Sequence, residues 1–462
     1  MKNIDAIIIG SGQAGNPLAL KLASAGWKTV LIERSEDHLG GTCTNEGCTP
    51  TKTLIGSAEK LHHIKTANEY GLSIRELNID FRKIQKRKND IVIDSRKKLN
   101  KRLAKTKNLE LIFGTASFLN NKTVSIDTVD KKEILLNSKS IFINVGCRPT
   151  KPEIKGLDRV PYYDSTSILS IKTIPKQLII IGGSSIGLEL GQMFSRFGTK
   201  VTIIEQSPQI LPHEDKDVAN SLLKILESED LEFKLNVTIN KVSLNNKDIT
   251  VEIKEKTKIA SIKGSHLLVA TGRTPNTDLL KVNTSGIIMN EKGFIKVNNK
   301  LETNVKGIYA LGDVNGGPAF THIAYDDYRI VYKNLVKNQK LSTKNRIIPY
   351  CIFTDPQLGR VGLNEDQAKK QNLDIEVITI LGSRITRGLE IGSTEGLWKA
   401  LVDKKTGLIL GASIIGSQGG EIVSVIQMAM LGKIKAKEVR DGIFAHPTFS
   451  ESLNTLFMEL NS

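Results

Sequence analysis

Two cysteines with four residues between them, Cys43 and Cys48, lie in the run Gly-Gly-Thr-Cys-Thr-Asn-Glu-Gly-Cys-Thr-Pro-Thr-Lys over residues 40–52. Thiols at this spacing can bind a metal, form a disulfide or stand together by chance. The run begins seven residues after Glu33, which closes a pattern typical of dinucleotide binding. A position beside a potential redox cofactor favours thiol–disulfide exchange, in which a thiolate attacks a sulfur–sulfur bond.

A glycine-rich pattern occurs twice in the chain. Residues 7–15 read Ile-Ile-Ile-Gly-Ser-Gly-Gln-Ala-Gly, and residues 179–187 repeat this pattern at an offset of 172. Each copy predicts a buried strand, a tight turn, a helix and a second strand that ends in a carboxylate. Such a turn lets the backbone approach a pyrophosphate, which the free N–H groups of the helix N-terminus then bind. The predicted binding residues are Gly10, Gly12, Gly15 and Glu33 in the first copy and Gly182, Gly183, Gly187 and Glu205 in the second.

We expect the two copies to bind different dinucleotides. The first leads directly into the cysteines, so its ligand must exchange electrons with a disulfide, which flavin does and nicotinamide does not. We therefore expect FAD in the first site and NAD(P)H in the second. Glu205 would repel a 2′-phosphate and so favours NADH, unless a nearby Lys or Arg offsets its charge. Ser184 replaces the middle glycine of the second copy, which leaves the fit around the pyrophosphate less well defined.

Together these segments resemble the class I pyridine nucleotide–disulfide oxidoreductases, which include glutathione reductase, dihydrolipoamide dehydrogenase and mercuric reductase. The resemblance covers essentially the whole chain, and it also rests on residues 270–275, 307–313 and 446–451. It implies an α/β protein with two Rossmann-like dinucleotide-binding domains and a C-terminal α+β dimerisation domain. The expected boundaries are 1–148 for the first part of the FAD domain, 149–272 for the NAD(P) domain, 273–343 for a central domain that completes the FAD site, and 344–462 for the interface domain.

The resemblance assigns different roles to the two cysteines. Cys48 is expected to lie against the flavin as the charge-transfer thiolate, and Cys43 is expected to be the interchange thiol that attacks the substrate. A helix that begins near Pro50 would lower the pKa of a thiol at its N-terminus. Lys52 and Glu189 match the family's buried ion pair beside flavin N5.

His446 and Glu451 match an acid–base pair of the family. There the histidine reaches the dithiol of the other subunit, so the resemblance implies an obligate homodimer with a shared active site. Cys147 and Cys351 lie in apolar, strand-like segments, and we expect both to be packing residues.

Further cofactor contacts follow from the resemblance. Asp313 is expected to bind the FAD ribitol, and Thr321 is expected to cap a helix that begins near His322 and points its dipole at the flavin. His322 itself is expected to be structural. The remaining residues expected to bind FAD are Gly41, Thr42, Lys52, Ala116, Gly146 and Ala324, and those expected at the nicotinamide nucleotide are Val237 and Gly272. No resident metal site is expected.

The charge of the chain is concentrated in one segment. The 462 residues carry a net charge of +16, and residues 82–107 hold twelve Lys or Arg and two Asp. Apolar residues in this segment recur at helical spacing, which predicts an amphipathic helix with a basic outer face. A solvated face is the ordinary explanation, and a docking surface for an acidic partner or substrate is the alternative. Nucleic acid is not expected, because no aromatic stacking surface accompanies the charge.

Composition narrows the class of protein further. A hydrophobic content of 39% with no long apolar stretch predicts a globular protein without a membrane span. The first strand is expected to start near Ile4, which leaves no room for a signal peptide. Only four cysteines are present, so a secreted disulfide framework is not expected. We expect a cytoplasmic protein instead.

The electron acceptor is less well defined by the sequence. Mercuric reductases end in a vicinal cysteine pair, which residues 457–462 lack, and thioredoxin reductases of high molecular weight also need such a pair. Dihydrolipoamide dehydrogenases commonly carry a histidine where Phe444 stands. The chain looks most similar to bacterial mercuric-reductase-like flavoproteins, including those of reactive-chlorine resistance, on residues 50–52, 320–331 and 446–454. We therefore expect an NAD(P)H-dependent reductase of a disulfide or metal-ion acceptor. A lipoamide dehydrogenase of a multienzyme complex and a non-catalytic FAD-containing scaffold that uses the basic helix are the alternatives.

Overall fold

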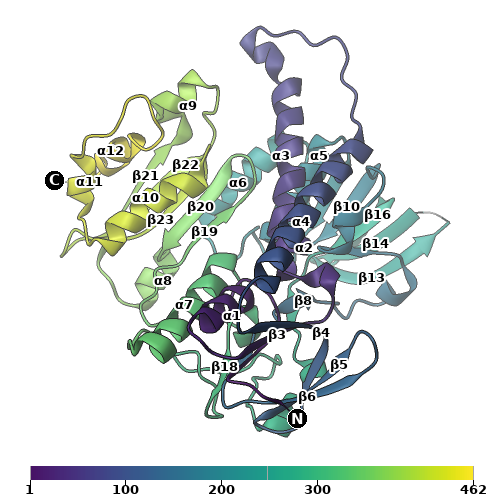
Figure 1. Cartoon of the computed structure of the whole chain (residues 1–462). Coiled ribbons are helices and arrows are strands. Elements are labelled where there is room, and N and C mark those ends of the chain that lie inside the picture. Colours follow the sequence, from purple (N-terminus) through teal and green to yellow (C-terminus); the bar gives the residue numbers. More distant parts are fainter. Residues whose placement is uncertain (1, 247, 461–462) are drawn as a thin grey trace.

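A computed structural model describes residues 2–246 and 248–460. The first unit of the protein is built on an eight-stranded sheet (Figure 1). The strand order is β1-β6-β5-β4-β3-β2-β7-β18. The strands are β1 (Lys2–Asn3), β2 (Ala6–Ile9), β3 (Thr29–Glu33), β4 (Leu109–Phe118), β5 (Thr123–Thr128), β6 (Glu133–Asn137), β7 (Ile141–Ile143) and β18 (Ile308–Ala310). Strands β4, β3, β2, β7 and β18 run parallel, and β2 and β3 are buried along their whole length, which explains their continuous apolar runs. Because β18 lies at the edge of this sheet, a segment far along the chain completes the first unit.

Helices cover this sheet and extend beyond it. They are α1 (Gly15–Ser24), α2 (Gly41–Asn45), α3 (Cys48–Lys65), α4 (Phe81–Ala104) and α7 (Thr321–Lys337). Helices α3 and α4 pack on one another, and the end of α3 rises above the body at the top of Figure 1.

The second unit repeats the strand–turn–helix–strand arrangement of the first. Its parallel sheet has the order β12-β11-β10-β16-β9, formed by β9 (Tyr163–Asp164), β10 (Gln177–Ile181), β11 (Lys200–Ile204), β12 (Glu232–Lys234) and β16 (His266–Val269). Helices α5 (Ser185–Arg196) and α6 (Lys216–Ser228) belong to it. An antiparallel sheet of β13 (Thr238–Asn245), β14 (Asp248–Glu255) and β15 (Lys258–Gly264) lies beside it, and the pair β8 (Cys147–Pro149) and β17 (Arg273–Pro275) spans the junction with the first unit.

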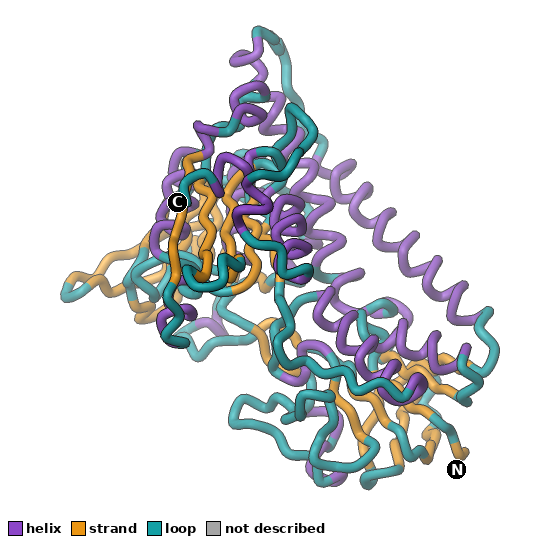
Figure 2. The backbone as a smooth tube through the Cα atoms, turned by 90° about the vertical axis from the view of Figure 1, so that its left-hand side faces the viewer, coloured by secondary structure: helices purple, strands orange, loops and turns teal. Residues whose placement is uncertain are grey.

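The C-terminal unit is an antiparallel sheet with the order β19-β20-β23-β22-β21. Its elements are β19 (Pro349–Ile352), β20 (Gln357–Gly362), α8 (Glu365–Lys370), β21 (Ile375–Leu381), α9 (Thr386–Glu390), β22 (Leu397–Asp403), β23 (Ile409–Gly416), α10 (Gly419–Leu431), α11 (Ala436–Arg440) and α12 (Ser452–Phe457). Trp398 and Phe457 are fully buried in its core. Figure 2 shows strands gathered near both ends of the chain and long helices along one flank between them. The predicted fold class, with two Rossmann-like units and a C-terminal α+β unit, is therefore confirmed.

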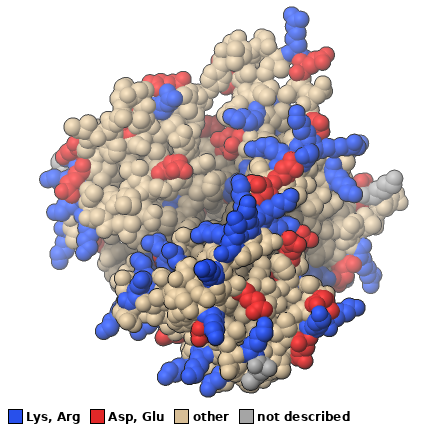
Figure 3. All heavy atoms as spheres, in the orientation of Figure 1, with Lys and Arg blue, Asp and Glu red and all other residues tan. Residues whose placement is uncertain are grey.

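The predicted basic helix is α4, and a band of Lys and Arg side chains follows it across the surface (Figure 3). One residue departs from the expected pattern. Lys88 is buried, and its Nζ donates a 2.7 Å hydrogen bond to the Leu169 carbonyl of the second unit. Lys88 is therefore an exception to the predicted basic outer face, because this side of α4 packs against the second unit. Within the described residues, no helix has both the length and the apolar character needed to cross a membrane.

Candidate active site

One cavity of about 1480 Å³ is lined by all three units. Many of the residues predicted from the sequence line it: Gly10, Gly12, Glu33, Gly41, Thr42, Cys43, Cys48, Lys52, Ala116, Gly146, Glu189, Asp313, Thr321 and Ala324. The remainder do not line it: Gly15, Gly182, Gly183, Gly187, Glu205, Val237, Gly272, His446 and Glu451. The structure thus gathers the predicted flavin residues around one space, together with the dithiol.

Hydrogen bonds to Glu33 hold the first glycine turn in place. Gly10 has a φ of +101°, which favours glycine, and a Cβ on Gly15 would lie only 1.9 Å from the Gly10 carbonyl oxygen. The Glu33 carboxylate accepts hydrogen bonds from the Ser11 N–H at 2.9 Å and the Ser11 hydroxyl at 2.7 Å. Strand β3 therefore holds the turn through Glu33, which also faces the cavity.

The second turn has the same construction. Glu205 accepts hydrogen bonds from the Gly183 N–H at 2.7 Å and from the Ser207 N–H at 2.8 Å. Ser184 is the N-cap of α5. Ser184 and Ser185 line the cavity, whereas the three glycines of this turn do not. An anion at this helix terminus would therefore meet serine side chains as well as backbone N–H groups.

Val237, expected from the sequence to contact the nicotinamide nucleotide, does not line the cavity. Its side chain is buried in the core with Ile179 and Val251, so only its backbone faces the neighbourhood of Glu205. Gly272 has a φ of +135°, which the turn between β16 and β17 requires.

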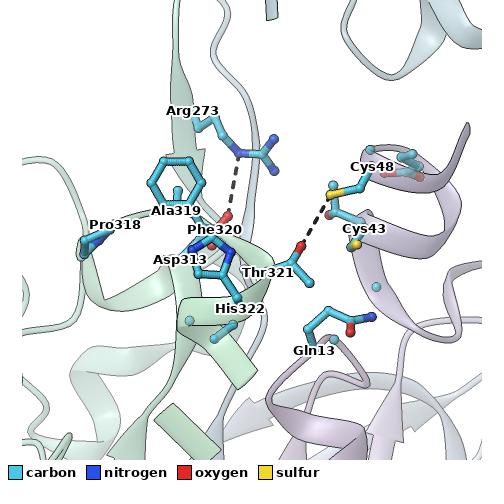
Figure 4. A pocket seen from close by; sticks show the side chains of 18 of the residues that line it. Gln13, Cys43, Cys48, Arg273, Asp313, Pro318, Ala319, Phe320, Thr321 and His322 are labelled. Carbon is cyan, nitrogen blue, oxygen red and sulfur yellow. Dashed lines mark hydrogen bonds and ion pairs between the residues drawn. The ribbon is translucent and has the colours of Figure 1, made fainter. Parts of the chain in front are cut away.

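The two cysteines lie on consecutive helices, Cys43 within α2 and Cys48 at the start of α3. Helix α3 begins at Cys48, two residues before the predicted start near Pro50, so Cys48 occupies the helix N-terminus itself. Its Sγ lies 3.3 Å from the Thr321 hydroxyl, as Figure 4 shows. A hydrogen bond from the Cys43 thiol, supported by Thr321 and by the Lys52 charge, lowers the pKa of Cys48 to about 6. The same bond, with burial, raises the pKa of Cys43, so Cys48 is the member of the pair that ionises first.

An ion pair lies beside the dithiol. The Lys52 Nζ is 2.5 Å from the Glu189 Oε2, and Glu189 is only 6% exposed. Glu189 also accepts a 2.9 Å hydrogen bond from the Phe353 N–H, and the Lys52 Nζ lies 4.7 Å from the centre of the Phe353 ring. The pair therefore joins α3 of the first unit, α5 of the second and the C-terminal unit.

The N-terminus of α7 faces the same space. The helix begins at Thr321, with Phe320 at the N-cap, so the expectation that Thr321 is the cap was wrong. The Thr321 side chain points instead toward Cys48 (Figure 4). His322, whose Nε2 lies 2.7 Å from the Pro349 carbonyl oxygen, holds α7 to β19.

Asp313 and Arg273 lie opposite one another on the cavity wall. The Arg273 Nε is 3.8 Å from the Asp313 Oδ2, and burial raises the pKa of the Asp313 carboxyl. The Arg273 Nε is buried and has no hydrogen-bond partner within the described residues. A bound polar group would supply that partner. Together with the cavity volume and the two glycine turns, this unpaired donor fits an extended dinucleotide such as FAD.

His446 and Glu451 form a pair away from the cavity. The His446 Nδ1 lies 2.9 Å from the Glu451 Oε2, and the histidine side chain is 69% exposed. The carboxylate can therefore orient the imidazole, while the other ring nitrogen is free to face solvent or another molecule. Within its own chain, the histidine does not reach the dithiol cavity.

Several cavity residues were not found from the sequence. Cys351 was expected to be a packing residue, but its half-buried thiol lines the cavity, and burial raises its pKa to about 12. Glu214 accepts hydrogen bonds from the Tyr350 hydroxyl and, at 2.7 Å, from Arg360. Phe320 stacks on the Tyr350 ring at 5.2 Å. No local motif signals these residues, because they lie far apart in the chain. Cys147 is buried, as expected.

One group of acidic side chains in the described part of the chain is close enough to share a metal ion: Asp215, Asp217 and Glu365. The buried ammonium of Lys399 already lies among them, 2.8 Å from the Asp217 Oδ1 and 3.1 Å from the Asp215 Oδ2. The Lys399 ammonium therefore occupies the position that a metal ion would take and offsets one of the three negative charges.

Comparison with known families agrees with this geometry. Residues 4–327 match the model of the pyridine nucleotide-disulphide oxidoreductases, and residues 348–457 match the dimerisation domain of the same class. The chain therefore belongs to the pyridine nucleotide–disulphide oxidoreductase family and is an enzyme of that family.

Individual relatives cover nearly the whole chain. It is 39% identical over 459 residues to the probable pyridine nucleotide-disulfide oxidoreductase RclA of Escherichia coli K12, covering 99% of each chain. It is 35% identical to a dihydrolipoyl dehydrogenase of Buchnera aphidicola from Acyrthosiphon pisum, covering 97% of this chain and 94% of the relative. It is 32% identical to a mercuric reductase of Staphylococcus aureus, covering 97% and 81%. The solved Cu(II) complex of the HOCl-induced flavoprotein disulfide reductase RclA from Escherichia coli superimposes with a TM-score of 0.91 at 38% identity over 100% of both chains.

Proposed function

We propose that this protein is an NAD(P)H-dependent flavoenzyme that passes electrons through the Cys43–Cys48 pair to a disulfide or metal-ion acceptor. The observation that carries the proposal is that one cavity is lined by both cysteines, by the Lys52–Glu189 pair and by residues from both glycine turns. Its volume of about 1480 Å³ and its lining support a site where two nucleotides meet beside a dithiol.

The binding roles divide between the two turns. Gly10, Gly12, Glu33, Asp313 and the N-terminus of α7 would hold FAD, which supplies chemistry that accepts hydride and exchanges electrons with a thiol. Ser184, Ser185 and the N-terminus of α5 would hold the pyrophosphate of the nicotinamide nucleotide. The Glu205 carboxylate favours NADH over NADPH. The domain boundaries at 148, 272 and 343 belong to the same proposal.

The side chains then have distinct tasks. Cys48, with a pKa of about 6, is held as a thiolate at neutral pH by the hydrogen bond from the Cys43 thiol, with smaller contributions from Thr321 and Lys52. The ammonium of Lys52 also stabilises negative charge that develops near it, while Glu189 limits the cost of burying that ammonium. Cys43 attacks the acceptor, and His446 of a second copy exchanges the proton with the help of its Glu451.

Dimerisation is part of this mechanism. The C-terminal unit matches a dimerisation domain, and the His446–Glu451 pair is exposed on that unit. A second copy that brings this pair to Cys43 would complete each site, so two sites would be shared between two chains.

A lipoamide dehydrogenase is the second candidate. The similarity to dihydrolipoyl dehydrogenases and the presence of the His446–Glu451 pair favour it. The non-catalytic scaffold considered from the sequence is not supported, because the chain belongs to a family of enzymes.

A steady-state screen separates these functions. NADH and NADPH oxidation would be measured with lipoamide, oxidised glutathione, copper(II) and mercury(II) as acceptors. Bleaching of the bound flavin by NADH supports the reductase, whereas a flavin that stays oxidised under excess NADH and NADPH would contradict it. Cys43→Ala should keep flavin reduction and lose acceptor turnover. Full turnover of this variant on every acceptor would contradict the role of the dithiol.

A further inference from the structure

A glycine-rich loop leads into the first turn of α7. Residues 316–319, Gly-Gly-Pro-Ala, are all exposed, and Gly316 has a φ of +75°. Glycine leaves the backbone free to adopt many conformations, so this loop does not by itself fix where α7 begins. Thr321, in the first turn, nevertheless has its hydroxyl 3.3 Å from the Cys48 Sγ. The position of Thr321 therefore depends on contacts with another element.

Strand β19 provides contacts on both sides of Thr321. The Phe320 ring stacks on the Tyr350 ring, with the ring centres 5.2 Å apart and the planes 11° apart. The His322 Nε2 lies 2.7 Å from the Pro349 carbonyl oxygen. Figure 4 shows the Phe320 ring and the Thr321 side chain pointing in different directions from the start of the helix. Because stacked aromatic rings attract one another, β19 holds the residues directly before and after Thr321.

Tyr350 is itself held by a buried ion pair. Its hydroxyl donates a hydrogen bond to the Glu214 carboxylate, and Arg360 donates a 2.7 Å hydrogen bond to the same group. The side chains of Glu214 and Arg360 are each only 3% exposed. Burial raises the pKa of Tyr350, and the negative charges of Glu214 and Asp215 add to the rise, so the hydroxyl stays protonated and remains a donor. The Tyr350 ring is therefore fixed in the orientation that Phe320 meets.

The same segment of the chain supports a second neighbour of Cys48. The ring of Phe353, which directly follows β19, has its centre 4.7 Å from the Lys52 Nζ. Lys52 and Thr321 both lower the pKa of Cys48, after the larger contribution of the hydrogen bond from Cys43. Residues 349–353 therefore contact both groups outside the dithiol that stabilise its thiolate.

We propose that Tyr350 is a positioning residue of the dithiol site, whose ring holds Phe320 and thereby keeps the Thr321 hydroxyl against the Cys48 sulfur. The inference rests on the proposed reductase function, because it assigns a role within the same site. A hydrogen bond weakens steeply as its atoms separate or its angle falls. Without the Tyr350 ring, Phe320 is free to move with the glycine-rich loop, and the Thr321 hydroxyl moves away from the thiolate that it stabilises.

The ionisation of Cys48 tests this role directly. All variants are made in a Cys43→Ser background, which leaves one thiol of the pair and keeps a hydroxyl beside it. The pH dependence of iodoacetamide alkylation at Cys48 is followed by peptide mass. Tyr350→Leu should raise the apparent pKa of Cys48 by about one unit, and Phe320→Leu, which removes the other ring of the stack, should give the same shift. An unchanged pKa in a folded variant of either kind would overturn the inference.

A conservative variant and a matched control show whether the ring and its location matter. Tyr350→Phe keeps the ring and should leave the pKa of Cys48 within about 0.3 unit of the Cys43→Ser value. Tyr163 is also half-buried and stacked, on His266 at 5.9 Å, but it does not line the cavity. Tyr163→Leu should therefore leave the pKa of Cys48 unchanged. Equal shifts in the leucine and phenylalanine variants of Tyr350, or in the leucine variants of Tyr350 and Tyr163, would contradict the inference.

A double variant tests the route through Thr321. Thr321→Val removes the hydroxyl, so in this background Tyr350 has nothing left to position against Cys48. Thr321→Val combined with Tyr350→Leu should therefore raise the pKa of Cys48 by about one unit, the same as either change alone. A shift of about two units, the sum of the single shifts, would show that Tyr350 acts on Cys48 by another route and would contradict the inference.

Turnover of the Tyr350→Leu variant, with Cys43 intact, separates this inference from the reductase proposal. A rise in the pKa of Cys48 from about 6 to about 7 lowers its thiolate fraction about fivefold at pH 6 and only slightly at about pH 8. Disulfide turnover should fall in the same pH-dependent way. If the pKa shifts but no acceptor is reduced by wild-type enzyme, the positioning role stands and the reductase proposal fails. If wild-type enzyme reduces an acceptor and the pKa does not shift, the reductase proposal stands and the positioning role fails.

Discussion

The Lys52 ammonium and the Glu189 carboxylate lie 2.5 Å apart and join helix α3 of the first unit to helix α5 of the second. Lys52 lies one turn after Cys48 on α3, and Glu189 lies one turn after the N-terminus of α5. Each residue therefore lies in the first turns of a helix whose N-terminus lines the cavity, with Cys48 at the start of α3 and Ser185 at the start of α5. Their contact fixes how the two halves of the cavity face one another.

We expect Glu189→Gln to slow flavin reduction by NADH about tenfold and to lower stability by about 2 kcal/mol. The amide keeps a hydrogen-bond acceptor for the Phe353 N–H but removes the charge that balances Lys52. Stopped-flow bleaching and chemical unfolding measure the two effects. Glu252→Gln is the matched control, because its 3.2 Å pair with Lys241 lies at the surface. Loss of stability without any change in the bleaching rate would show that the pair is only structural.

The ionisation of Cys48 predicts a pH dependence. Its pKa is lowered from 9.0 to about 6, so the reduced enzyme should hold a thiolate above pH 6 and lose it below. A lowered pKa stabilises the folded state through the ionised form, so this contribution grows from pH 6, is complete above pH 9 and is absent in acid. The pH profile of alkylation of the reduced enzyme, resolved by peptide mass, reports the Cys48 ionisation.

Thr321→Val should raise the apparent pKa of Cys48 by about one unit, because it removes the hydroxyl 3.3 Å from the sulfur. Thr321→Ser retains the hydroxyl and should keep the wild-type profile. If the valine variant titrates like wild type, Thr321 does not support the thiolate.

The sequence was sufficient for those parts of the site that depend on one short segment. The glycine turns, the dithiol and the start of α7 are each encoded within about ten residues, because a tight turn or a helix N-terminus depends on local backbone geometry. Thr321 shows the limit of this reasoning, since its hydroxyl was free to cap the helix or to reach Cys48, and only the tertiary structure decides between them.

The residues that the sequence did not reveal depend on contacts between distant segments. Glu214, Tyr350 and Arg360 meet only because β19 and β20 pack beside the second unit, and no pattern within one segment reports that approach. Cys351 looked like a core thiol for the same reason. Lys88 looked like a surface cation because helical periodicity cannot show which neighbour covers a helix.

Glycine substitutions test the second turn. A Cβ on Gly187 would lie 2.0 Å from the Gly182 carbonyl oxygen, so Gly187→Ala should push α5 away from β10, lower stability by about 2 kcal/mol and weaken NADH binding at least tenfold. Gly56→Ala is the control in α3, where nothing lies within 4 Å of the new methyl group. That change should stabilise the protein by about 0.5–1 kcal/mol, because alanine favours a helix interior. Thermal unfolding and NADH titration check both variants, and tight NADH binding by Gly187→Ala would contradict the role of this turn.

A mixing experiment tests whether each site is built from two chains. Cys43→Ser and His446→Ala should each be inactive in disulfide turnover when expressed alone. If the His446–Glu451 pair of one copy serves the Cys43 of the other, a heterodimer of the two variants contains one intact site and one doubly defective site. Random pairing in co-expressing cells should then restore about a quarter of wild-type activity. Differently tagged chains allow the heterodimer to be purified, and it should show about half of the wild-type activity. A heterodimer without activity would show that the histidine acts within its own chain, and an active His446→Ala homodimer would show that the histidine is not needed.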